Sequence, residues 1–298
     1  MKKLTLSWLH LTFSAIDTSR LLLACLSVLF GSAFTRSFGL PTFWPDILKL
    51  LIWVSLLLAG FDCLNTAMDG AWPDELSLEA NPALPVKRLH ELARNYMILF
   101  ALALMSVSAM ALFQLFSRLP WQGLPPILAV GIYLVFGLPL WLRGWERLAV
   151  VTEPAFALAT SFLLPAFVFS LSRDTMKGEL LRLSFPLFLL LLAWSLSRGL
   201  EKKLRGAKPE ASCLAVWLAA PDCLSLTATL LAISALLIVF SGALLPFPLR
   251  LGLVMLNGSA IFLLMRSLTR REPYWTTASI LISTIPHIYL LALLAALW

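Results

Sequence analysis

Three oxygen-bearing side chains, Asp62, Asn65 and Asp69, come at the end of a long apolar run. Side chains at positions i, i+3 and i+7 of a helix lie on one side of it, so these three form a column. Carboxylate and amide oxygens are the ligands that hard divalent cations take in proteins. The spacing therefore predicts a cation site where an apolar helix ends. In the alternative interpretation, Asp69 and Asp74 are ordinary interface residues and Asp62 pairs with an arginine.

The chain that carries this column is strongly apolar. Of its 298 residues, 60% are hydrophobic and only 13% are charged, and the mean hydropathy is +0.87. Soluble domains contain about twice this share of charged residues, so the composition indicates a polytopic membrane protein. The apolar runs are continuous rather than alternating, which favours helices over a β-barrel. We attribute the net charge of +7 to membrane topology and lipid headgroups, and we expect no nucleic acid partner.

Runs of about 20 apolar residues, each long enough to span a bilayer, can be counted along the chain. We expect about nine spans, at residues 14–35, 46–66, 95–116, 124–142, 150–171, 180–197, 224–243, 247–266 and 277–297. This count predicts an all-α membrane fold, a single transmembrane domain over residues 1–298, and termini on opposite sides of the membrane. Asp17 and Arg20 lie inside the first run or just before its apolar core.

The basic residues predict which side of the membrane each connection faces. Fifteen Lys and Arg residues lie on the N-terminal side, seven lie on the other, and Arg20 lies at a span's edge. Because cytoplasmic loops are rich in Lys and Arg, we expect a cytoplasmic N-terminus and a C-terminal Trp298 outside. The two longest polar connections, 67–94 and 198–213, then share the cytoplasmic face. We expect the site there, in a protein of the bacterial inner membrane.

The acidic stretch resembles the first motif of the UbiA superfamily of intramembrane prenyltransferases, Asn-Asp-x-x-Asp-x-x-x-Asp. Members of this family have nine transmembrane helices and carry the motif at the cytoplasmic end of the second. A second Asp-rich motif lies in the loop after their sixth helix. The two motifs hold magnesium ions that bind the diphosphate of an isoprenyl donor. The resemblance covers nearly the whole chain through span count, loop placement and topology.

Two registers align the stretch with this motif. In one, Asp62, Asn65 and Asp69 occupy the three acidic positions, with the middle acid changed to an amide. In the other, Asn65 is the leading asparagine, Asp69 is the second acid, and Asp74 follows one residue late. Both registers keep Asn65 and Asp69, for which the resemblance implies a catalytic role. It implies Mg²⁺ as the cofactor, with Asp62 and Asp74 as further ligands.

The connection after the sixth expected span departs from the family. Where members have Asp-x-x-x-Asp, this chain has Arg198 and Lys202, and Glu201 alone supplies a carboxylate for a metal. If a diphosphate binds, Arg198, Lys202 and Lys203 can neutralise it directly, with one magnesium ion or none. The alternative is that this basic segment contacts anionic lipid.

A further candidate for the diphosphate lies in the segment WLRGWERLAVVTEP, which follows the fourth expected span. Family members often carry basic residues here that touch the diphosphate, which makes Arg143 a candidate. The alternative is that Arg143 only anchors the cytoplasmic end of a span.

Taken together, the resemblance implies transfer of an isoprenyl group from a prenyl diphosphate to a lipophilic acceptor, aromatic or quinone-type. The alternative is a catalytically inactive protein of this fold, which binds a lipid or quinone or serves as a subunit of a membrane complex. The number of carboxylates is the feature that distinguishes the active enzyme from the inactive protein. This chain offers fewer carboxylates than a site for two magnesium ions needs. A transporter is a third interpretation, although the sequence has no visible inverted repeat.

Overall fold

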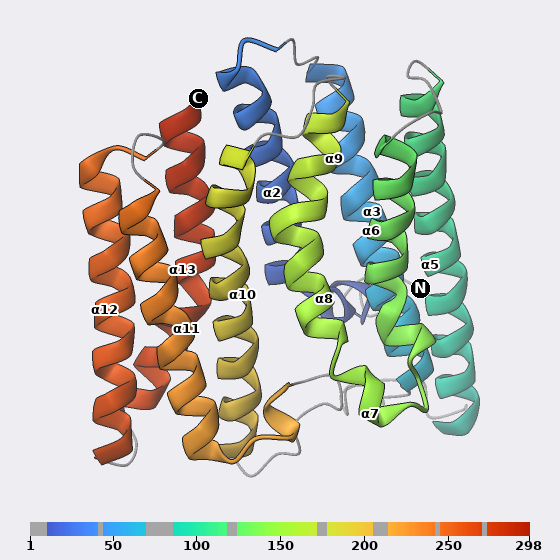
Figure 1. The fold of residues 1–298 in the computed structure, drawn as a ribbon. Coiled ribbons are helices and arrows are strands. Elements are labelled where there is room, and N and C mark those ends of the chain that lie inside the picture. Colours follow the sequence, from blue (N-terminus) through green and yellow to red (C-terminus); the bar gives the residue numbers. More distant parts are fainter. Residues whose placement is uncertain are drawn as a thin grey trace. The chain divides into compact units, whose positions relative to one another are not determined.

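The computed structural model describes residues 11–40, 44–69, 86–117, 124–171, 178–204, 214–241, 245–269 and 273–298. The side chains of residues 86–90, 146–147, 202–204, 214, 268–269 and 273–274 are not described. Within these ranges the chain is almost entirely helical and has no strand (Figure 1). Nine helical segments of the described chain are long and apolar enough to cross a membrane, which confirms the expected number of spans. The protein is integral to a membrane.

The spanning segments follow one another along the sequence much as their hydropathy predicts. In chain order the helices are α2 (Thr18–Ser37), α3 (Trp44–Asp69), α5 (Val86–Phe116), α6 (Leu124–Trp141), α7 (Glu146–Ala149), α8 (Thr152–Leu158), α9 (Leu164–Ser170), α10 (Gly178–Leu204), α11 (Ala220–Phe240), α12 (Phe247–Thr269) and α13 (Pro273–Leu297). A short π-helical turn, Ala159–Leu163, joins α8 to α9 into one span, and a 3₁₀ turn, Leu214–Val216, precedes α11. The chain splits into two compact units, each described by itself. A single domain over residues 1–298 stays a prediction.

Unit 1 contains residues 1–25 and 44–120, and hence the start of α2 with α3 and α5. Helices α3 and α5 pack closely at Gly60, where an added Cβ would lie 2.7 Å from the Met105 Cγ and 3.3 Å from the Ala101 carbonyl oxygen. The Ser108 hydroxyl donates a hydrogen bond of 2.9 Å to the Trp53 carbonyl across the same interface. Small side chains that let two helices approach are typical of membrane interfaces.

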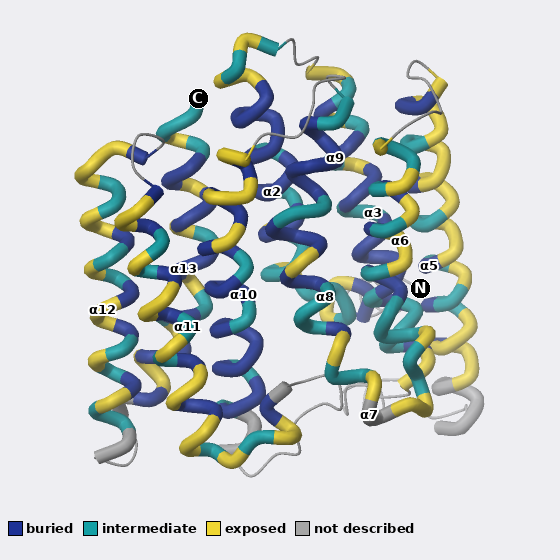
Figure 2. The backbone as a smooth tube through the Cα atoms, viewed as in Figure 1, coloured by how far each residue is buried: buried dark blue, intermediate teal, exposed yellow. Residues whose placement is uncertain are grey.

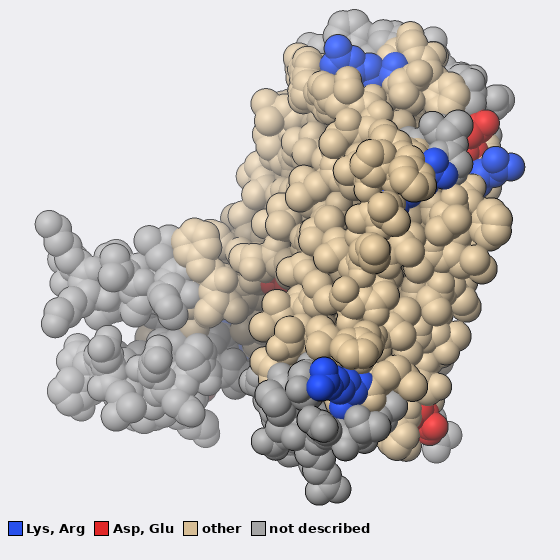
Figure 3. All heavy atoms as spheres, turned by 90° about the vertical axis from the view of Figure 1, so that its left-hand side faces the viewer, with Lys and Arg blue, Asp and Glu red and all other residues tan. Residues whose placement is uncertain are grey.

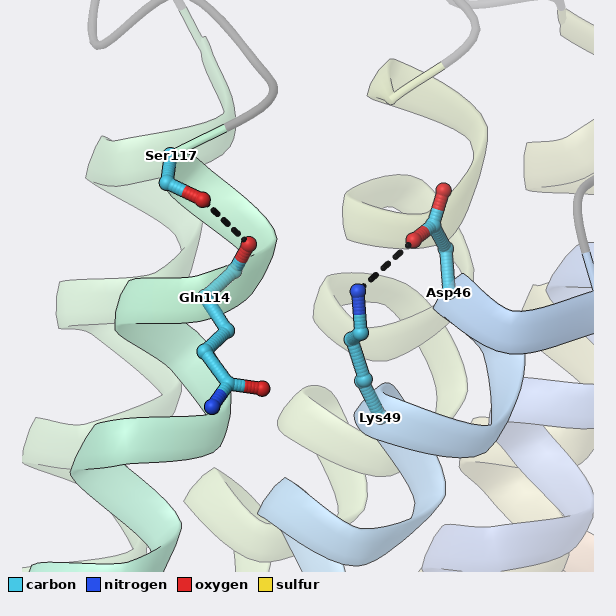
Figure 4. A network of polar contacts seen from close by, with 4 residues as sticks. All are labelled: Asp46, Lys49, Gln114 and Ser117. Carbon is cyan, nitrogen blue, oxygen red and sulfur yellow. Dashed lines mark hydrogen bonds and ion pairs between the residues drawn. The ribbon is translucent and has the colours of Figure 1, made fainter.

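The first turn of α3 and the last residues of α5 carry short-range polar contacts (Figure 4). Lys49 pairs with Asp46 at 3.4 Å, one turn along α3. The Ser117 hydroxyl, just after α5, donates to the Gln114 carbonyl at 2.8 Å. Each contact stays within one helix or its last turn, so neither joins α3 to α5.

Unit 2 contains residues 26–43 and 121–298 and is built around α10. Of the apolar window of α10, 72% is buried, compared with 22% for α12, a difference visible in Figure 2. The buried Tyr289 hydroxyl of α13 donates to the Leu183 carbonyl of α10 at 2.8 Å. The Ser234 hydroxyl of α11 reaches the Pro186 carbonyl of α10 at 3.4 Å, which satisfies both polar groups inside the bundle.

The outward faces of α11 and α12 are apolar. Large hydrophobic side chains are exposed along both helices, among them Ile233, Leu236, Met255 and Phe262. Figure 3 shows a broad band of uncharged side chains over this face, with most of the visible Lys, Arg, Asp and Glu side chains toward its upper and lower ends. An uncharged band bounded by charge is what a bilayer requires of a lipid-facing surface.

Several helix boundaries differ from the sequence prediction: α5 begins at Val86 rather than at residue 95, and α11 and α13 each begin four residues early. Two further differences have a physical reason. The first span begins at Thr18 rather than at residue 14, because the chain bends at Ile16 and Asp17 caps the new helix. The residues from 198 to 204, expected in a loop, form the last two turns of α10. Nothing in that segment stops a helix before Gly206, so α10 extends past its apolar part with its basic residues on it.

Candidate functional site

The predicted column lies on the last two turns of α3. Asp62, Asn65 and Asp69 all belong to this one helix, so the spacing places them on one side of it, as predicted. Asp62 and Asn65 are half-buried and Asp69 is exposed. The column thus runs from the partly covered part of α3 to its open end.

A neighbouring face of α3 packs into the interior of unit 1. Cys63 and Ala67 are buried there in one cluster with Leu11, Ala93 and Met97. These contacts pack α3 against α5 and against the helical segment at residues 11–15.

Asp62 also makes a contact that sequence reasoning missed. The Asp17 backbone N–H donates a hydrogen bond of 3.0 Å to the Asp62 Oδ2. The Asp17 Oδ1 in turn accepts the backbone N–H groups of Ser19 (3.1 Å) and Arg20 (3.2 Å) at the start of α2. An Asp directly before a helix is a recognisable N-cap signal, but nothing in the sequence pairs it with Asp62.

The column fits a magnesium ion by the chemistry of its donors. Magnesium takes oxygen ligands and is commonly held by one or two carboxylates together with water and substrate phosphates. Asp62 and Asp69 supply carboxylates and Asn65 supplies an amide oxygen, so the set matches that pattern. Among the described His, Cys, Asp and Glu side chains, no group of three could hold a metal by itself. Asp74 lies outside the described residues.

Unit 2 places two of the other candidates on α10. The Arg198 guanidinium carbon lies 5.0 Å from the centre of the Trp194 ring, one turn earlier on the helix. The Glu201 Oε2 accepts a hydrogen bond of 3.1 Å from the Ser279 hydroxyl of α13. Both Arg198 and Glu201 are half-buried. The backbone of Lys202 and Lys203 belongs to α10, and their side chains are not described.

Arg143 lies in the turn between α6 and α7. It is half-buried and precedes Gly144, whose φ of 83° reverses the chain in a conformation that favours glycine. Figure 1 shows α7 and the end of α10 at the same end of unit 2. The turn that holds Arg143 and the last two turns of α10, which hold Arg198, therefore lie toward the same end of this unit.

The comparisons with known proteins agree with this architecture. No protein-family model matches the sequence, and no curated protein does. A solved structure described as digeranylgeranylglyceryl phosphate synthase in membranes aligns with 100% of this chain and 99% of its own, with a TM-score of 0.64 and 16% identity. A UbiA homolog from Archaeoglobus fulgidus, described as bound to GPP and Mg²⁺, aligns with 93% of this chain and 98% of its own, with a TM-score of 0.50 and 14% identity. The chain has a UbiA-type fold.

The UbiA-type fold that the sequence predicted is thus confirmed. In it, α3 is the second span of this chain and α10 is the sixth. The acidic column stands at the end of the second span, and Arg198 and Glu201 stand near the end of the sixth. These are the positions where the resemblance implies the two motifs.

Proposed function

We propose that the protein is an intramembrane prenyltransferase, which transfers an isoprenyl group from a prenyl diphosphate to a lipophilic acceptor of the aromatic or quinone type. The observation that carries the proposal is the likeness over the whole chain to a structure described as digeranylgeranylglyceryl phosphate synthase. The UbiA homolog, described as bound to GPP and Mg²⁺, supports the choice of donor and cofactor. The proposed location is the bacterial inner membrane, with the site open to the cytoplasm.

The column on α3 is the proposed place of the donor's headgroup. Asp62, Asn65 and Asp69 would hold Mg²⁺, and Asp74 is the further ligand of the second register. Bound there, Mg²⁺ would neutralise the diphosphate and stabilise the charge that grows on it as it departs. Asp62 and Asn65 are half-buried, and polar groups near membrane depth commonly line a cavity or contact another polar group.

The basic residues of unit 2 are the proposed partners of the diphosphate oxygens. The Arg198 guanidinium can donate two parallel hydrogen bonds to a phosphate, and its position against the Trp194 ring limits its rotamers. Arg143, Lys202 and Lys203 would add positive charge. These cations would take over part of the neutralisation that a second acidic motif and its magnesium provide elsewhere in the family. Glu201 would be the remaining carboxylate of that motif.

The reaction itself makes one bond and breaks one. The bond between the allylic carbon and the diphosphate oxygen breaks, and the oxygen keeps the electron pair. The allylic carbon then bonds to an electron-rich atom of the acceptor, which releases a proton to water. The chain's contribution is to bind the headgroup, hold the isoprenoid tail among apolar helices and exclude water from the allylic carbon.

The proposal is tested by incubating purified protein with radiolabelled geranylgeranyl or farnesyl diphosphate, Mg²⁺ and a panel of quinone precursors. The parallel variants are Asp69→Ala and Lys202→Ala. We expect a labelled lipophilic product that depends on Mg²⁺ and disappears in Asp69→Ala. Tight binding of the diphosphate without product would instead support the inactive lipid-binding alternative. If the protein neither binds the diphosphate nor forms product, the enzyme proposal fails and a purely structural role remains.

A further inference from the structure

The hydrogen bond between Asp17 and Asp62 joins residues 45 positions apart in the sequence. It connects the start of α2 to the end of α3, and it involves the one candidate ligand that lies deepest in the column. The donor is a backbone N–H group, which a change of side chain does not remove. What the Asp17 side chain controls is where that N–H points.

The Asp17 carboxylate holds the local backbone in place. Its Oδ1 accepts the N–H groups of both Ser19 and Arg20, the pattern of a helix N-cap. The chain reaches this point from a helical segment at residues 11–15 and a bend at Ile16. Leu11, on that segment, is buried in the cluster with Cys63 and Ala67 of α3. The Asp17 N–H is therefore fixed from both sides, by the cap and by the packing of the preceding turn.

A hydrogen bond to one oxygen of a ligating carboxylate orients it. The Asp62 carboxylate has two oxygens with about four acceptor positions, so accepting the Asp17 N–H at Oδ2 is compatible with holding a cation. The N-terminal end of α2 lies at the same place, where the Asp17 carboxylate caps it. Groups that hold metal ligands in this way influence metal affinity strongly although they do not touch the metal.

We propose that Asp17 is the positioning residue of the cation site, which sets the orientation of the Asp62 carboxylate through its own backbone N–H. This inference rests on the proposed function of the α3 column. Asp17 is not a ligand in this account. It acts through Asp62 alone, and that dependence is what an experiment can detect.

The test measures Mn²⁺ binding to the purified full-length protein by electron paramagnetic resonance, with geranylgeranyl diphosphate present. The variants are Asp17→Ala, Asp17→Asn, Asp62→Ala and the double variant Asp17→Ala with Asp62→Ala. We expect Asp17→Ala to raise the half-saturating Mn²⁺ concentration about tenfold. Asp17→Asn keeps a capping oxygen and should restore near wild-type binding. In the Asp62→Ala background, Asp17→Ala should have no further effect.

A matched control is Asp46→Ala, which removes a carboxylate from the first turn of α3 and should leave Mn²⁺ binding unchanged. If Asp17→Ala does not fold, Asp17→Gly replaces it, because glycine is tolerated at an N-cap and lacks the capping oxygen. Unchanged Mn²⁺ binding in the folded Asp17 variant, or an effect that persists without Asp62, would overturn the inference alone. A wild-type protein that binds no Mn²⁺ would overturn the proposed function and the inference with it.

Discussion

The Ser279 hydroxyl donates a hydrogen bond of 3.1 Å to the Glu201 carboxylate, which links the second turn of α13 to the last turn of α10. The two residues are 78 positions apart in the sequence. The sequence resemblance also makes Glu201 a candidate metal ligand. This residue therefore has a structural task in addition to the metal-binding role proposed for it.

The structural task predicts a loss of stability in Ser279→Ala. Removing the hydroxyl leaves the half-buried Glu201 carboxylate without this donor, which should cost about 0.5–1.5 kcal/mol of the free energy of unfolding. Thermal unfolding in detergent measures this loss of stability. The control is Ser283→Ala, one turn further along α13, where the hydroxyl bonds only its own helix at Ile280. Equal effects of the two substitutions would contradict a stabilising bond between α10 and α13.

Arg198 provides a second prediction, about the diphosphate. Arg198→Ala should weaken the binding of inorganic pyrophosphate about tenfold, because a charge-assisted hydrogen bond to phosphate is lost. Isothermal titration calorimetry at fixed Mg²⁺ concentration measures the change.

The chain offers a close control for this measurement. Arg266, near the end of α12, lies 5.8 Å from the centre of the Phe262 ring, also one turn earlier on its own helix. Arg266→Ala removes the same charge and the same kind of ring contact from a helix that carries no candidate site residue. We expect it to bind pyrophosphate like the wild type. A similar loss in both variants would mean that net charge, rather than Arg198, sets the affinity.

Substitution by alanine should affect stability differently at two glycines of unit 2, Gly31 and Gly258. A Cβ on Gly31 would lie 2.8 Å from the Pro165 Cα and 3.0 Å from its carbonyl oxygen, and backbone atoms cannot move aside cheaply. Gly31→Ala should therefore destabilise the protein by about 1–3 kcal/mol. A Cβ on Gly258 meets nothing within 4 Å, so Gly258→Ala should be neutral or stabilising by up to about 1 kcal/mol. Thermal unfolding in detergent measures both variants. A Gly31→Ala variant as stable as Gly258→Ala would contradict the importance of the close approach at Gly31.

The two registers of the acidic motif make different predictions. If Asp62 is an acid of the motif, Asp62→Ala should weaken Mg²⁺ binding and Asp74→Ala should not. If Asp74 is the last acid, the effects should be reversed. Fluorescence of a bound prenyl diphosphate analogue, followed as Mg²⁺ is added, distinguishes them. In both registers Asn65→Asp should preserve binding, because it replaces one oxygen ligand by a stronger one.

Much of this architecture could be predicted from the sequence because it depends on local patterns. The spans follow from continuous apolar runs, and the acidic column follows from helical spacing within α3. The end of α10 differs from the prediction because hydropathy marks only the apolar part of a helix, whereas Arg198 to Leu204 continue α10 beyond that part.

The contacts that complete the candidate site could not be predicted. The bond from Asp17 to Asp62 and the bond from Ser279 to Glu201 join distant parts of the chain, and their partners carry no matching signal. Only the packing of the helices brings them together. Only the position of Asp17 directly before a helix is a local signal, and it predicts a helix N-cap rather than a contact with Asp62.

The central claim is that the oxygen ligands at the end of α3 hold a magnesium-bound diphosphate. The most direct test compares Mg²⁺-dependent binding of radiolabelled geranylgeranyl diphosphate by the wild type, by Asp69→Ala and by the control Asp46→Ala. We expect tight binding that requires Mg²⁺ in the wild type and in Asp46→Ala, and binding weakened at least about tenfold in Asp69→Ala. Wild-type affinity and magnesium dependence in Asp69→Ala would contradict the claim.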